Sequence, residues 1–314
     1  MEQSIATRRP RRPLGARIRG VLREMRKEWT AYLFLSPGLL LFCVFWVFTI
    51  GFSFYLSFHD WNILEPARPF VGLDNYRDLL TDRRFHQAVV NTVYYTALSV
   101  PLTMVAGLVL ALLLNNPIKA RGLFRTLYYI PVITPLVVSA IIWKWVYQGD
   151  YGLLNYYLLR LGLISSPLRW LSDPNLAMPA VILMSVWGGA GYDMVIYLAG
   201  LQAIPEDYYD AAKVDGANGL QRLVHITIPL LAPTTFFLFV MSTIGSFQVF
   251  TQIFIMTSGG PLGRTTTIGY RLYEKAFRHF DMGYASAMAY ALFAMVLGFT
   301  LLQLRYMRQR DIVY

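Results

Sequence analysis

Long apolar segments that carry no charge alternate with polar loops along this chain. No Asp, Glu, Lys or Arg lies between Thr30 and Asp60, between Phe85 and Ile118, or between Leu223 and Gly263. A helix of about 20 apolar residues crosses the ~30 Å core of a bilayer. The pattern therefore predicts an all-α membrane protein with six transmembrane helices. The predicted spans cover residues 31–58, 87–115, 124–147, 177–202, 230–256 and 284–306.

Composition supports this class. Of the 314 residues, 56% are hydrophobic and only 15% are charged, whereas a soluble domain carries about 25% charged residues. The third predicted span contains Pro131 and Pro135. Proline removes a helical hydrogen bond and clashes with the preceding turn, so we expect a bend or a shifted boundary there.

The distribution of basic residues predicts the orientation. The tail before the first span, the loops after the second and fourth spans and the C-terminal tail together hold 17 Lys and Arg, whereas the opposite loops hold ten. The positive-inside rule then places both termini in the cytoplasm. We expect two regions, a basic cytoplasmic tail over residues 1–29 and a transmembrane domain over residues 30–314.

The net charge of +10 comes largely from the tail. A basic cluster beside a first span is usually a topology signal or a contact with anionic lipid. No folded nucleic-acid reader accompanies it, so we expect membrane lipid and no nucleic acid as its partner.

Catalytic and metal-binding patterns are not evident in the sequence. A nucleotide-binding loop needs Gly-x-x-x-x-Gly-Lys-Ser/Thr, and the nearest imitation, Gly259 to Thr265, has the wrong spacing and no lysine. The four histidines are scattered without ligand spacing. We therefore expect no enzyme, no metal and no cofactor in this chain, which would conduct a solute with energy supplied by a partner.

One polar loop, residues 204–229, stands out between the fourth and fifth predicted spans. Pro205 favours a helix start, and Glu206 and Asp207 suit the positive end of the helix dipole. Gly216 can adopt the positive φ that ends a helix, and a second apolar run from Leu220 stops at Pro229. The loop is expected to dock another protein; an amphipathic helix lying on the membrane is the alternative.

The residues of this loop resemble the "EAA" motif of permease subunits of bacterial ABC importers. Asp210-Ala211-Ala212 is followed by Asp215-Gly216-Ala217 and, nine residues later, by Ile226-Thr227-Ile228-Pro229. The runs Phe70–Tyr76, Gly152–Asn155 and Ser258–Pro261 also resemble the carbohydrate branch of that family, of the maltose and glycerol-3-phosphate permease type.

The resemblance implies a type I ABC importer permease fold with a cytoplasmic coupling helix, in the bacterial inner membrane. It implies as partners a second permease subunit, two ABC ATPase subunits that bind ATP and Mg, an extracytoplasmic solute-binding protein and a sugar. The expected ATPase-docking residues are Glu206, Asp210, Ala211, Ala212, Asp215 and Gly216. Asp210 replaces the family's usual Glu and is one methylene shorter.

Candidate pathway residues lie in the fourth and fifth spans. Asp193, beside Tyr192, is the only acid inside a span. It either lines the pathway or pairs with Lys144 or with backbone loosened by neighbouring glycines. Polar residues of the fifth span fall at helical spacing, either as a substrate stripe or as helix–helix contacts. These residues are Ser242, Ser246, Gln248 and Gln252.

We therefore expect an ATP-driven, binding-protein-dependent sugar permease that works by alternating access. One alternative is an ion-coupled secondary transporter, which would need more intramembrane ionisable groups than Asp193 and Lys144. Another is the same permease type carrying glycerol-3-phosphate or another small polar solute.

Overall fold

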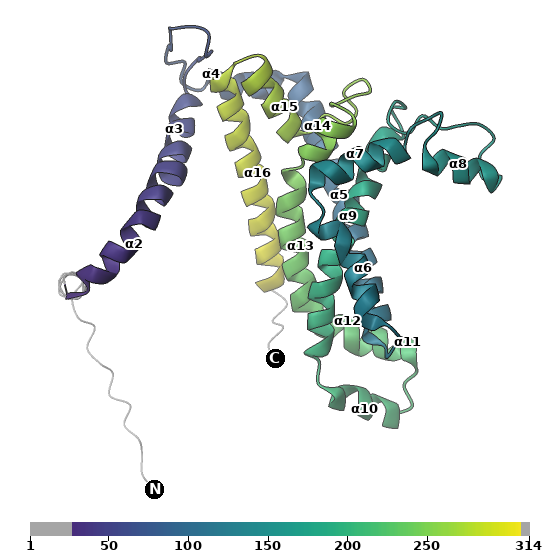
Figure 1. The fold of residues 1–314 in the computed structure, drawn as a ribbon. Helices are drawn as coiled ribbons and strands as arrows, with labels where there is room; N and C mark the ends of the chain where they lie inside the picture. The colour runs from purple at the N-terminus through teal and green to yellow at the C-terminus, as the bar shows by residue number, and fades with distance from the viewer. Residues whose placement is uncertain (1–26, 309–314) are drawn as a thin grey trace. The chain divides into compact units, whose positions relative to one another are not determined.

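A computed structural model describes residues 27–308, in which helices dominate (Figure 1). Two isolated bridges, His59–Phe70 and Asn62–Asp281, are the β-structure within these residues. The chain divides into one unit up to Tyr55 and a second from Leu56 onward. Almost all of the predicted 1–29 tail lies outside the described residues.

The first unit is one apolar helical segment. It comprises α2 (Trp29–Phe42), a π-helical turn η1 (Cys43–Phe48) and α3 (Thr49–Leu56). Together they form a 28-residue candidate span. No side chain of α2 or η1 is buried, which suits contact with lipid. The first predicted span is confirmed, with ends shifted by two residues.

The second unit is built around α5 (Arg83–Asn115) and α9 (Ala177–Gln202), which pack along their lengths. Glycine allows their closest approach. A Cβ added at Gly107 of α5 would lie 2.5 Å from Cβ of Asp193 and 3.0 Å from the backbone nitrogen of Met194. Buried apolar side chains, including Met104, Leu114 and Tyr197, fill the contact around this point.

The third predicted span is broken, as its prolines indicated. Helix α6 (Arg121–Ile133) and helix α7 (Leu136–Val146) meet at an angle of 97°. Thr134 and Pro135 have extended ψ values of 130° and 129° between them. Proline disfavours the helical conformation of the residue before it, which places the break at Thr134.

The fifth predicted span, 230–256, is wrong as one continuous helix. A helical segment from Gly219 runs past Pro229 to Leu230 and meets α13 (Ala232–Phe247) at 62°. A π-helical turn, η2 (Leu223–Thr227), precedes Pro229, and its wider turn accommodates the missing N–H. This segment consists of α11 (Gly219–Arg222), η2 and α12 (Ile228–Leu230).

Beyond α13 the helix breaks again before α14 (Thr251–Met256). Phe250 has φ −140° and ψ −58°, which is not helical. The last long helix is α16 (Met282–Arg308). Within the described residues, four helices are long and apolar enough to cross a membrane, and each bent pair could supply one further span. Counting each bent pair as one span gives six, the predicted number, although the second pair covers residues 219–247 rather than 230–256.

Short helices occupy the connections. They are α4 (Asp74–Thr81), α8 (Leu153–Arg160), α10 (Glu206–Val214), α15 (Ile268–Tyr273) and η3 (Glu274–Arg278). Helix α10 lies at one end of the second unit, and α15 lies at the other (Figure 1).

Candidate transport pathway and docking loop

A cavity of about 730 Å³ lies where the broken helices meet α5 and α9. Its wall includes the α6–α7 break at Thr134 and Pro135 and the α13–α14 break at Gln248 to Phe250. Non-helical backbone at membrane depth is tolerated where it lines a polar cavity. Discontinuous helices around such a cavity are typical of transporter substrate sites.

Asp193 is the one acidic residue among the described residues of the cavity wall, and none of them is Lys, Arg or His. The residue is 2% exposed, and its Oδ2 atom has no hydrogen-bond partner. Ser139 of α7 is similarly buried in the same wall, and its Oγ atom also lacks a partner. Buried polar atoms without a partner in a cavity wall need an explanation, and a polar solute bound in this cavity would supply one.

The structure does not support the alternative in which Asp193 is a structural partner of Lys144. Lys144 donates from Nζ to the backbone oxygen of Ile255 at 3.3 Å and is exposed. No ion pair joins it to Asp193 within residues 27–308. Asp193 does not serve to bond loosened backbone either. Helix α9 runs unbroken through Gly188, Gly189 and Gly191.

The other pathway candidates line the same cavity but do not form one helical stripe. Ser242 and Ser246 lie on α13, Gln248 caps it, and Gln252 lies on α14 beyond the break. Ser246 donates from Oγ to the backbone oxygen of Thr243 at 3.0 Å. Tyr192 lines the cavity and is 41% exposed. The fold thus gathers all five predicted residues by bending the chain.

The docking loop, residues 204–229, is ordered by its own hydrogen bonds. Helix α10 begins at Glu206, with Pro205 at the position before the helix. At its end Gly216 has φ +78°. The amide of Gly216 donates to Lys213 and that of Ala217 donates to Ala212, at 3.1 and 2.8 Å. These two bonds make a Schellman motif.

A capping box follows immediately, in which Asn218 and Gln221 each accept from the other's backbone amide. The Tyr209 hydroxyl lies 3.0 Å from Oγ1 of Thr227, which ties α10 to the second half of the loop. The rest of the loop surface is open. Asp210, Ala211, Asp215 and Gly216 are exposed, as is Glu206, while Ala212 is half-buried.

Comparison with known proteins identifies the family. Residues 103–312 match the model of the binding-protein-dependent transport system inner membrane component. The chain is 38% identical to the trehalose/maltose transport system permease protein MalF of Thermococcus litoralis, over 91% of this chain and 96% of that protein. It is 36% identical to the lactose transport system permease protein LacF of Rhizobium radiobacter, over 89% and 94%. The chain belongs to this family.

The fold agrees with that membership. A crystal structure of a bacterial alginate ABC transporter in complex with alginate pentasaccharide-bound periplasmic protein matches with a TM-score of 0.79. The match has 23% identity and covers 93% of this permease and 98% of that chain. The predicted ABC importer permease fold is confirmed, and the chain is a membrane component of a transport system.

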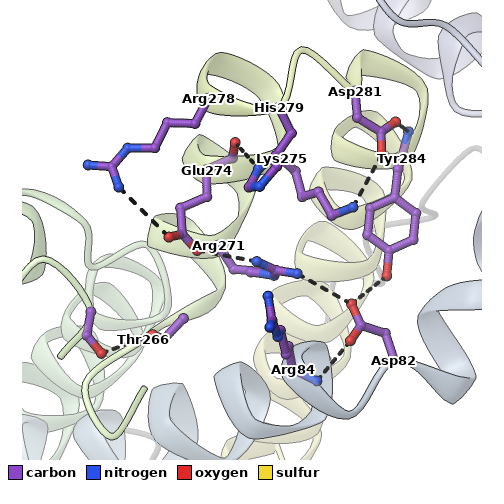
Figure 2. Close-up of polar contacts among 11 residues, drawn as sticks. Asp82, Arg84, Thr266, Arg271, Glu274, Lys275, Arg278, His279, Asp281 and Tyr284 are labelled. Carbon is purple, nitrogen blue, oxygen red and sulfur yellow. Dashed lines mark hydrogen bonds and ion pairs between the residues drawn. The ribbon is translucent and has the colours of Figure 1, made fainter. Parts of the chain in front are cut away.

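At the other end of the permease, seven residues form what we call the α15 network: Asp82, Arg271, Glu274, Lys275, Arg278, Asp281 and Tyr284 (Figure 2). Arg271 is 7% exposed; it lies 3.3 Å from a carboxylate oxygen of Glu274 and 3.9 Å from one of Asp82. Tyr284 donates to Asp82 at 2.9 Å. The network joins the start of α5 to α15, η3 and α16.

Burial opposes the ionisation of Asp82, but other contacts outweigh it. The Tyr284 hydroxyl, the backbone amides of Arg84 and Phe85 and the charge of Arg271 together lower the pKa of Asp82 below its usual value. The carboxylate also caps α5, accepting from the amide of Arg84 at 2.8 Å.

Sequence reasoning missed two groups of residues. Ser139 gave no signal, because a serine in a span usually bonds within its own helix. The α15 network was counted only as outside-loop charge. The i, i+3 spacing of Arg271 and Glu274 could have indicated one pair, but Asp82 lies nearly two hundred positions away in the chain.

Proposed function

We propose that this permease forms the translocation pathway of an ATP-driven importer for an uncharged sugar. The observation that carries the proposal is a cavity whose wall contains Asp193 and Ser139, each with a buried oxygen that lacks a partner, together with Gln248 and Gln252. Hydroxyl groups both donate and accept, so a sugar can satisfy carboxylate, hydroxyl and amide groups together. The sugar-transport names of MalF and LacF support this substrate class.

The charge of the cavity favours a neutral solute over glycerol-3-phosphate. Among the residues that line it, Asp193 is a carboxylate, and none is Lys, Arg or His. A phosphate group would meet no cation there, and burying an unpaired anion is costly. A partner permease would contribute the rest of the pathway.

The energy source is proposed to be a pair of ABC ATPases that dock on the 204–229 loop, in the cytoplasm. ATP-driven closure would move α10 and rock the spans, opening the cavity to a solute-binding protein on the other side. The exposed residues Glu206, Asp210, Ala211, Asp215 and Gly216, with half-buried Ala212, would form the docking surface. ATP and Mg would bind in the partner.

Asp210 in this loop pairs with Lys213 at 2.8 Å, and both side chains are more than half exposed. An exposed pair of this kind is worth less than about 1 kcal/mol. The carboxylate of Asp210 is therefore free to exchange Lys213 for a group on the ATPase.

Purification from the native membrane tests the partnership. We expect an ABC ATPase and a second permease to co-purify with the wild-type chain. Gly216→Pro should lose the ATPase, because proline cannot adopt the φ of +78° that ends α10. Recovery of no ATPase with the wild-type chain would refute the proposal and favour an ion-coupled transporter.

Uptake into proteoliposomes containing the purified complex tests the substrate. Labelled maltose, trehalose and lactose would be compared with labelled glycerol-3-phosphate. Asp193→Asn should reduce sugar uptake while ATPase docking persists. Unchanged uptake and apparent affinity in Asp193→Asn would remove this residue from the pathway.

A further inference from the structure

Two arginines of α6 converge on one amide at the end of α9. Arg121 and Arg125 lie one turn apart, in the first part of α6. Gln202 is the last residue of α9. With its amide oriented so that Oε1 faces the arginines, that oxygen accepts from Nη2 of both, each at 3.2 Å. A single neutral oxygen thus serves two cations.

These charges are not balanced within residues 27–308. Neither arginine forms an ion pair with a carboxylate there, and the Nε atoms of both are buried without a hydrogen-bond partner. Like charges four residues apart repel each other along a helix. A buried donor without an acceptor is costly, more so when it is charged. The arrangement would be stabilised by an anion that accepts from both guanidinium groups.

The surroundings indicate where such an anion would come from. On the adjoining face of α6, Phe124 and Tyr128 are 39% and 40% exposed. This apolar surface belongs to a candidate span and suits contact with acyl chains. Gln202, which the arginines contact, ends α9 four residues before α10 begins, so the arginines lie at the end of the second unit that carries α10. Basic sites between helices at this depth are suited to lipid headgroups.

We propose that Arg121 and Arg125 bind the phosphate group of an anionic lipid, with Gln202 holding the two side chains together. Each planar guanidinium keeps several N–H donors after its bond to Gln202 and can engage phosphate oxygens in bidentate fashion. The acyl chains would lie along Phe124 and Tyr128, which adjoin the arginine face of α6 at helical spacing. This site is separate from the cavity and does not depend on the substrate.

The experiment measures phosphatidylglycerol binding by the full-length chain. Purified protein would be placed in phosphatidylcholine nanodiscs with increasing phosphatidylglycerol, and bound lipid would be quantified by native mass spectrometry. We expect apparent affinity to fall about fivefold for each arginine removed in Arg121→Gln and Arg125→Gln. Lys119→Gln is the matched control, because Lys119 is exposed two residues before Arg121 and is not among the residues that hydrogen-bond to Gln202.

A second variant keeps the test decisive if the arginine variants fold poorly. Gln202→Glu places a carboxylate between the two guanidinium groups and supplies the missing negative charge from within the chain. We expect this variant to fold, to have a higher unfolding temperature in pure phosphatidylcholine, and to lose its preference for phosphatidylglycerol.

Three results would overturn the proposal: unchanged lipid binding in the double arginine variant, an equal loss in Lys119→Gln, or full lipid preference in Gln202→Glu. Inorganic phosphate separates the two sources of this chemistry. If phosphate displaces phosphatidylglycerol and raises the unfolding temperature without lipid, the site belongs to a soluble phosphate rather than to a headgroup. No effect of phosphate, with lipid binding intact, supports the headgroup.

Discussion

Charged side chains are buried and paired at one end of the second unit and exposed at the other. In the α15 network, Arg271 is 7% exposed and contacts two carboxylates from different parts of the chain. In the docking loop, Asp210 and Lys213 are 66% and 57% exposed in their side chains, and Val214 beside them is 88% exposed. Charged groups of the α15 network contact one another, whereas those of the docking loop remain accessible to solvent.

The buried charges matter for the stability of the fold, and the exposed charges are available to bind a partner protein. A buried charge that loses its partner is left uncompensated, so the α15 network should be sensitive to single changes. An exposed charge is screened by water and contributes little to stability, but it can exchange partners. An exposed valine next to exposed charges fits a surface that a second protein covers.

The largest effect is expected for Arg271→Ala. Removing this guanidinium leaves Glu274 and Asp82 without their central cation, and we expect a loss of about 3–5 kcal/mol in unfolding free energy. Denaturant unfolding in detergent micelles measures it. Arg278→Ala is the control, because Arg278 is 50% exposed and its guanidinium lies 4.0 Å from Glu274 and 5.9 Å from the centre of the Tyr273 ring. Equal effects of the two changes would contradict the buried-network interpretation.

Asp82→Asn comes next and depends on pH. The pKa of Asp82 is lowered in the folded state. The ionised carboxylate therefore stabilises the folded protein fully at pH values above the unfolded pKa of about 3.9. This stabilisation is lost as the pH falls through the pKa of the folded state. We expect the variant to lose about 1–3 kcal/mol at neutral pH.

Unfolding temperatures of wild type and Asp82→Asn should therefore converge as the pH is lowered below about 4. Asp74→Asn is the matched control, since the Asp74–Arg77 pair is 59% and 77% exposed and should contribute little. A difference that stays constant from neutral to acidic pH would assign the effect of Asp82→Asn to packing rather than to charge.

Gly216→Val tests the docking loop. A branched residue at φ +78° costs about 1–2 kcal/mol locally, enough to reduce the population of the native turn about tenfold. Global stability should change little, because opening this exposed turn relieves the strain locally and an added Cβ meets no packed neighbour within 4 Å. We expect import by the purified complex to fall about tenfold. Gly219→Ala, also in open space, should retain import.

The smallest effect is expected for Lys213→Ala. It removes an exposed i, i+3 pair, worth about 0.2–0.5 kcal/mol. Thermal unfolding should be unchanged within error. A loss as large as that of Arg271→Ala would end the distinction between the two ends of the molecule.

The sequence by itself determined the helices, bends and helix ends that depend only on residues close together in the chain. Uncharged apolar length specified the spans, because a bilayer accepts only such segments as helices. Pro135 specified the bend between α6 and α7 through its effect on Thr134. Gly216 specified the end of α10, since positive φ favours glycine. The motif around Asp210 identified the family.

Only the tertiary structure decided which distant side chains meet. The break at Phe250 was not predicted, because no proline or glycine marks it; beyond it, α14 packs against α7 and α9. That break brings Gln252 to the cavity of Asp193 and Ser139. Lys144 contacts the backbone oxygen of Ile255 rather than Asp193. Arg271 meets Asp82 only through the packing of α15 against α5, a contact that no local periodicity encodes.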